Sequence, residues 1–228
     1  KAPFDKKGVR QALALGMDRA AITNDMYKGN AEYGTYPITK SMGSPPYIEI
    51  KDRGAAAELY TYNPTKAKQL LAEAGFSSGM DISILTPRGR YLNDVQACEA
   101  IAGMLTAVGI RTKVNAVEFG VFAKQTQAHQ IPELMYAAWG NPHFDVLYTV
   151  AAVLRSGEMF SWYSNKQMDD LIDAAKQTVD PKKHEDTLRR LLRLMYDDPP
   201  FGYLYNQRDI YGVNKRLVWE PRSDEDLN

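Results

Sequence analysis

Helical and extended patterns alternate between residues 64 and 139, and this alternation restricts the possible folds more than any other feature of the chain. Apolar residues recur every three or four positions in some stretches and every second position in others. The expected helices cover residues 64–75, 93–109 and 120–130, and the expected strands cover 80–87, 110–119 and 133–139. This order predicts an α/β fold with a mixed, mostly parallel sheet flanked by helices.

Further helices are expected on both sides of this region. Residues 3–22 favour two successive helices, and residues 165–179 and 181–198 favour two more. Each begins close to a residue whose side chain can accept hydrogen bonds from the first free backbone N–H groups. The expected caps are Asp5, Asp18, Asn165 and Asp180.

Two segments have weaker patterns. Residues 201–219 have strand character, with turns expected near Asn206 and Asn214. Residues 29–63 lack a clear period but contain many aromatic residues, which are uncommon in free linkers. We therefore expect an ordered connection, packed by Tyr33, Tyr36, Tyr47, Tyr60 and Tyr62.

Composition and residue spacing exclude several classes of function. The 28 basic and 28 acidic residues cancel, which argues against nucleic acid as the main partner. No run of eighteen apolar residues is present that would suit a membrane span. The three histidines are far apart and form no helical pair, so no metal site is expected. The only glycine-rich stretch follows a helix rather than a strand, so no cofactor is expected. Cys98 lies on an apolar helix face and is expected to be a small buried residue.

Polar and aromatic residues gather where two expected strands end. Arg90 and Tyr91 follow the strand at 80–87, and the stretch WGNPHFD follows the strand at 133–139. In an open α/β sheet, ligands bind beyond the carboxyl ends of the strands. Amphipathic rings beside hydrogen-bonding groups suit a small polar ligand. The candidate binding residues in the second stretch are Trp139, Gly140, Asn141, His143, Phe144 and Asp145.

Several stretches together resemble a known family. PFDKKGVRQALALGMDRAAI is similar to its opening helices, YNPTKAKQLLAEAGF to its next helix, and WYSNKQMDDLIDAA and IYGVNKRLVWEPRSDEDL to later elements. In this order they resemble the C-terminal lobe of extracytoplasmic solute-binding proteins of the dipeptide, oligopeptide and nickel group (family 5), which feed ABC importers.

The resemblance implies a periplasmic-binding-protein-like (type II) lobe over residues 1–200. Residues 201–228 would then be closing strands that lead back towards a missing N-terminal lobe. It also implies a small solute and ABC permease subunits as partners. The expected location is periplasmic, or extracytoplasmic and anchored to the bacterial membrane.

The same resemblance draws attention to one departure in the candidate site. In peptide-binding relatives the Trp-Gly pair is followed by Ala-Asp-Tyr, and that aspartate resembles the anchor for the peptide α-amino group. Here Trp139 and Gly140 are followed by Asn141, Pro142 and His143, which leaves Asp145 as a possible substitute. The ligand is therefore expected to be a peptide or similar small polar solute that need not have a free amino terminus, and the alternatives include a peptide held by its backbone, an oligosaccharide and an opine-like compound.

In this interpretation Arg90 pairs with a ligand carboxylate. Aromatic rings stack on apolar or sugar faces of the ligand. The residues expected to stack are Tyr91, Trp139, Phe144 and Trp162.

Two other functions are compatible with the residues alone. An α/β hydrolytic domain would use His143 and Asp145 as a general-base pair, although no nucleophile stands at a suitable turn. A non-catalytic interaction module would expose the tyrosine-rich segment 33–62. A binding protein without catalytic residues is the interpretation that the resemblance favours.

Overall fold

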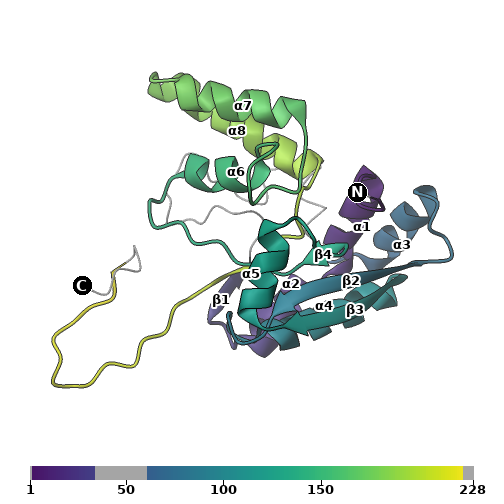
Figure 1. Ribbon diagram of the computed structural model, residues 1–228, viewed down its shortest axis with the longest axis horizontal. Helices are drawn as coiled ribbons and strands as arrows, with labels where there is room; N and C mark the ends of the chain where they lie inside the picture. Colours follow the sequence, from purple (N-terminus) through teal and green to yellow (C-terminus); the bar gives the residue numbers. More distant parts are fainter. Residues whose placement is uncertain (1, 34–60, 223–228) are drawn as a thin grey trace.

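A computed structural model describes residues 2–33 and 61–222, and Figure 1 shows the arrangement of its elements. The helices are α1 (Lys7–Gly16), α2 (Arg19–Ala21), the π-helix η1 (Ile22–Met26), α3 (Pro64–Glu73), α4 (Asp94–Ala107), α5 (Phe119–Gln127), α6 (Val146–Leu154), α7 (Lys166–Gln177) and α8 (Pro181–Asp197). The strands are β1 (Ala31–Tyr33), β2 (Met80–Pro87), β3 (Ile110–Val117), β4 (Leu134–Met135) and β5 (Tyr205–Gln207).

The central sheet has the strand order β3-β2-β4, and both pairs in it are parallel. Helices α4 and α5 make the two crossovers and lie on opposite faces of the sheet (Figure 1). The separate pair β1–β5 is antiparallel, so the described sheets are mixed and mostly parallel. The predicted α/β class is confirmed.

Strand β4 is much shorter than the predicted strand at 133–139. The Tyr136 N–H donates to the Leu85 carbonyl at 2.8 Å, which is the last bond between β4 and β2. In a parallel ladder the next bond would come from the N–H of residue 87. Residue 87 is a proline and has no N–H, so the chain leaves the sheet after Tyr136.

Most of the expected helix caps are present. Side-chain oxygens of Asp18, Asn165 and Asp180 accept backbone N–H groups at the starts of α2, α7 and α8. The prediction for Asp5 is wrong, because α1 begins at Lys7 with Lys6 at the N-cap position and Asp5 lies one residue too early.

The buried apolar residues that the structure describes form two clusters. The first joins α1, α3 and α4 to the central sheet and includes Cys98, whose pKa burial raises to about 11. The second joins α6, α7 and α8, which lie together on one side of the sheet layer (Figure 1). No helix was expected at α6, whose residues are apolar on almost every side.

The C-terminal region contains less strand than its sequence suggested. Within residues 201–222, the described part of this region, only β5 forms, and residues 208–222 continue as an extended segment away from the helices (Figure 1). Asn206 lies within β5 rather than in a turn, whereas the turn near Asn214 is confirmed by the Leu217 N–H bond to the Asn214 carbonyl. The tyrosines at 36, 47 and 60 lie outside the described residues.

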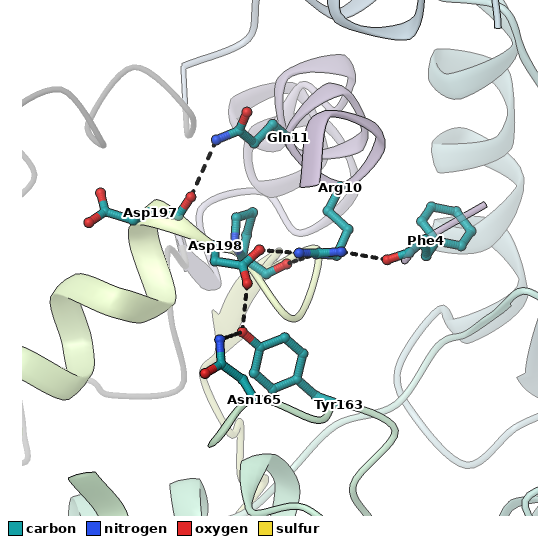
Figure 2. A network of polar contacts seen from close by, with 8 residues as sticks. Phe4, Arg10, Gln11, Tyr163, Asn165, Asp197 and Asp198 are labelled. Carbon is teal, nitrogen blue, oxygen red and sulfur yellow. Dashed lines mark hydrogen bonds and ion pairs between the residues drawn. The ribbon is translucent and has the colours of Figure 1, made fainter. Parts of the chain in front are cut away.

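A polar network joins the two clusters (Figure 2). The Arg10 guanidinium of α1 pairs with Asp198 and donates to the carbonyls of Phe4 and Pro199, at 2.6 and 3.1 Å. The Tyr163 hydroxyl donates to Asp198 at 2.8 Å, and burial together with this carboxylate raises the tyrosine pKa to about 12. One guanidinium thus connects the start of the chain to the end of α8.

Candidate functional site

Three loops meet at one edge of the molecule, because the carboxyl ends of β2, β3 and β4 point the same way. They are the β2–α4 loop (88–93), the short β3–α5 connection at residue 118, and the β4–α6 loop (136–145). We call this region the carboxyl edge. Both stretches predicted to bind ligand begin here.

The β2–α4 loop is shaped by the buried side chain of Asp94, which is 3% exposed. Its carboxylate accepts the backbone N–H groups of Arg90, Tyr91 and Val95 at 2.8, 3.1 and 2.9 Å. Burial alone raises the pKa of Asp94, but the backbone donors outweigh burial and hold it below its usual value. Asn93, which directly precedes α4, has a positive φ of 55° and makes no side-chain cap.

The Asp94 carboxylate binds the backbone of Arg90 and not its side chain, so the Arg90 guanidinium makes its contacts elsewhere. It lies over the rings of Phe119 and Tyr91, with 5.3 and 5.6 Å to the centroids. In the part of the chain that the structure describes, no carboxylate forms a salt bridge with it. The carboxyl edge therefore presents a positive charge bordered by aromatic rings.

Buried tyrosines connect this loop to the next one. The Tyr136 ring is edge-on to Tyr91 at 5.9 Å, and its hydroxyl contacts that of Tyr205. The Tyr205 and Tyr27 hydroxyls are 2.6 Å apart, and Tyr27 donates to the Leu92 carbonyl at 2.8 Å. Burial raises the pKa of both Tyr136 and Tyr205.

Tyr91 was predicted as a site residue, whereas Tyr27, Tyr136, Tyr205 and Phe119 were not. Tyr136 and Phe119 each stand beside the end of a strand, and that position was the available signal. Tyr27 and Tyr205 carried no comparable signal, since their contact depends on packing across the chain.

The β4–α6 loop carries an exposed group of rings. Trp139 is 39% exposed, and its ring is 5.3 Å from Phe160 and 6.5 Å from Tyr148. The His143 ring stands edge-on to Tyr148 at 4.8 Å. We call Trp139, His143, Tyr148 and Phe160 the ring cluster. Gly140 is exposed beside it, and Phe144 has a positive φ of 52°.

Polar side chains of this loop bind its own backbone and α6. The Asn141 amide donates to the Asp145 carbonyl and the Thr149 hydroxyl, at 2.7 and 2.9 Å. Asp145 Oδ1 accepts the Leu147 N–H at 2.8 Å and so caps α6. The Asp145 side chain therefore binds the start of α6, whereas the His143 ring contacts Tyr148.

The structure does not bring Trp162 to the predicted group. Its ring contacts His129, at 5.1 Å between centroids, just beyond the C-terminal end of α5. Helix α5 starts at the carboxyl edge and has nine residues, so this end is about 13 Å further along its axis. Among the described residues, no three His, Cys, Asp or Glu side chains are placed to hold a metal ion, and no helix is long and apolar enough to cross a membrane.

Comparison with known proteins adds evidence from outside the chain. Residues 1–161 match the model of a family described as "Bacterial extracellular solute-binding proteins, family 5 Middle". The oligopeptide-binding protein AppA of Bacillus subtilis (strain 168) is 27% identical over 239 residues, which cover 97% of this chain and 43% of that protein. The dipeptide-binding protein of Escherichia coli (strain K12) is 29% identical over 209 residues, covering 88% of this chain and 37% of that protein.

A solved structure has the same fold. The ABC transporter-associated periplasmic binding protein DppA from Helicobacter pylori, in complex with the peptide STSA, matches with a TM-score of 0.76 and 21% identity. The match covers 90% of this chain and 40% of that one, so the chain spans less than half the length of these relatives. The predicted type II periplasmic-binding-protein-like fold is confirmed.

Proposed function

Since the chain belongs to the family 5 bacterial extracellular solute-binding proteins, we propose that it is part of the substrate-binding component of an ABC importer. It captures a peptide or similar small polar solute at the carboxyl edge and delivers it to permease subunits. The relatives named above are binding proteins, which supports binding without catalysis.

One observation carries the proposed chemistry of the ligand. The acidic side chains Asp94, Glu118 and Asp145 follow β2, β3 and β4, and each accepts backbone N–H groups of its loop or helix. The Arg90 guanidinium has aromatic neighbours instead of a carboxylate. This arrangement suits a ligand with a carboxylate, held by Arg90 through two parallel hydrogen bonds.

Exposed and half-buried rings supply apolar contact around this charge. Tyr91, Trp139, His143 and Phe144 are proposed to line the ligand, with Gly140 allowing close approach of the backbone. Asn141 and Asp145 are proposed to shape the loop that carries them. Trp162 lies beside α5 and is assigned to the ligand only if the ligand extends along that helix.

The chain covers 37–43% of the two curated relatives, so we propose that it supplies one side of a two-lobed site. Residues 1–200 form the lobe, and residues 201–228 lead towards the other lobe. Ligand shifts the open–closed equilibrium only through contacts that improve on closure. The whole protein is proposed to act outside the cytoplasm, in the periplasm or anchored to the outer side of the membrane.

Native mass spectrometry tests this function. The sample is the full-length protein, purified from its host under conditions that keep a bound solute. Co-purified masses that form a ladder of peptides are the expected result. A single non-peptide mass with a carboxylate would keep the role of Arg90 but change the solute. Absence of any bound solute, together with no binding of di-, tri- or tetrapeptides by calorimetry, contradicts the proposal.

The two-lobe arrangement has a separate test. The 228-residue chain alone should bind the same solute at least about a hundredfold more weakly than the full-length protein, because it supplies only part of the contacts, a difference of about 2.7 kcal/mol. Tight micromolar binding by this chain alone contradicts a site shared between two lobes.

A further inference from the structure

We propose that Asn141 is a positioning residue, which holds residues 141–145 in the conformation that presents Trp139 and His143 to the ligand. The ligand part of this inference rests on the proposed function. The conformational part rests on the contacts of the loop alone.

The Asn141 side chain binds both backbone groups of one residue. Its Nδ2 group donates to the Asp145 carbonyl at 2.7 Å, and its Oδ1 accepts the Asp145 N–H at 3.2 Å. The second Nδ2 proton reaches the hydroxyl of Thr149 at 2.9 Å. Thr149 lies in α6 and is only 1% exposed, so the amide ties the loop to a buried part of the helix.

Phe144, which lies between these contacts, has a strained backbone conformation that requires support from its surroundings. Phe144 has a φ of 52°, in the left-handed region that bulky residues rarely adopt, because Cβ comes too close to the backbone. Such a conformation persists where the surrounding contacts enforce it. The Phe144 N–H also donates to the backbone carbonyl of Asn141 at 3.2 Å. Asn141 therefore binds the chain on both sides of the strained residue, through its backbone at Phe144 and through its side chain at Asp145.

The turn decides where the neighbouring groups point. His143 comes directly before Phe144, and its ring stands against Tyr148. Asp145 comes directly after and caps α6 through the Leu147 N–H. If Phe144 returned to a negative φ, the chain direction on both sides would change. The ring cluster would lose His143, and α6 would lose its cap.

Hydrogen exchange of the Leu147 amide reports on this turn without any ligand. This N–H is bonded to Asp145 and not to Asn141, so its protection depends on the loop conformation. In Asn141→Ala we expect it to exchange about tenfold faster, as a loss of about 1.4 kcal/mol would give. In a Phe144→Gly background the same change should accelerate exchange by less than about twofold, because glycine adopts positive φ without a clamp.

The ligand part is measured with trialanine, titrated into the full-length protein and its variants. Asn141→Ala should weaken trialanine binding about tenfold, and by less than about twofold in the Phe144→Gly background. Asn214→Ala is the matched control, since its Oδ1 also accepts a nearby backbone N–H but lies in the exposed C-terminal segment. It should change neither measurement.

Different failures have different meanings. The inference is overturned if Asn141→Ala has equal effects with Phe144 and with glycine at position 144, or if it leaves Leu147 exchange unchanged. Weaker trialanine binding with unchanged exchange assigns Asn141 to direct ligand contact instead. Failure of the unaltered protein to bind trialanine counts against a peptide ligand, while the exchange measurements still decide the role of Asn141. If Asn141→Ala does not fold, Thr149→Val removes one of the described contacts of the Asn141 side chain and is measured in the same two backgrounds.

Discussion

At the scale of single residues, Asp94, Glu118 and Asp145 each stand at the start of the helix that follows a strand, and each binds backbone N–H groups. Their negative charges are therefore engaged in shaping loops and starting helices. Arg90 is different, because its backbone is held by Asp94 while its guanidinium lies between two rings. The loop geometry and the binding charge thus come from different residues.

Replacing Arg90 tests the binding charge. Arg90→Gln should weaken the binding of a carboxylate-bearing solute by about 1.5–3 kcal/mol, the usual contribution of a hydrogen bond to a charged group. Thermal stability should change little, because the side chain is exposed. Arg88→Gln, an exposed arginine two residues earlier, is the matched control for calorimetry. Equal loss in both variants would indicate a general effect of charge rather than a contact by Arg90.

Asp145 can be tested separately as a charge and as a cap. Asparagine caps helices about as well as aspartate, so Asp145→Asn should leave the unfolding free energy nearly unchanged. Asp145→Ala should lower it by about 1 kcal/mol through loss of the cap, as measured by urea unfolding. If Asp145→Asn also abolished solute binding, its charge would be the amine anchor and not only part of the α6 start.

At the scale of elements, the loops of the carboxyl edge are joined through three hydroxyl groups. The Tyr27 proton goes to the Leu92 carbonyl, so Tyr205 must donate to Tyr27 and Tyr136 must donate to Tyr205. Tyr205 is the middle hydroxyl of the three, because it accepts from Tyr136 and donates to Tyr27. It connects the β1–β5 pair to the ends of β4 and of the β2–α4 loop.

Removing the middle hydroxyl should have the largest effect. Tyr205→Phe leaves the buried Tyr136 hydroxyl without an acceptor, and should lower the unfolding free energy by about 1–3 kcal/mol. Tyr136→Phe removes only the terminal donor and should cost less. Tyr211→Phe, on the exposed C-terminal segment, serves as the control in the same urea titration. A smaller loss for Tyr205→Phe than for Tyr136→Phe would contradict this order of donation.

At the scale of the whole molecule, two apolar clusters meet at the Arg10 network (Figure 2). The Arg10 and Asp198 side chains are only 15% and 21% exposed, and the Tyr163 hydroxyl shares the carboxylate. The ring cluster also crosses this junction, since Trp139 follows the sheet while Tyr148 belongs to α6. The relative position of the two clusters therefore affects the shape of the candidate site.

Arg10→Ala should destabilise the protein by about 3 kcal/mol, because it removes the cation that pairs with a partly buried carboxylate and the donor to two carbonyls, and leaves Asp198 with the Tyr163 hydroxyl. Amide exchange in α7 and α8 should then become faster than in α3 and α4, as the second cluster opens separately. Arg111→Ala, which breaks the exposed pair with Asp81, is the matched control and should change little. Uniform acceleration across both clusters would show that Arg10 does not join two separable units.

The sequence by itself determined the α/β class, the order of most elements and the caps Asp18, Asn165 and Asp180. It also indicated which loops stand at the carboxyl edge. These features depend on side-chain periodicity and on hydrogen bonds between residues two or three positions apart, so they are visible in a short stretch of chain.

The tertiary structure alone decided which groups meet. The Arg10–Asp198 pair spans 188 residues and the Tyr27–Tyr205 contact spans 178, and no local pattern specifies such partners. The same holds for Trp162 beside α5, for Arg90 over Phe119, and for the apolar helix α6, which needs its neighbours to cover it. Packing between distant elements selects these contacts, because the partners lie far apart along the chain and only the folded arrangement of the elements holds them together.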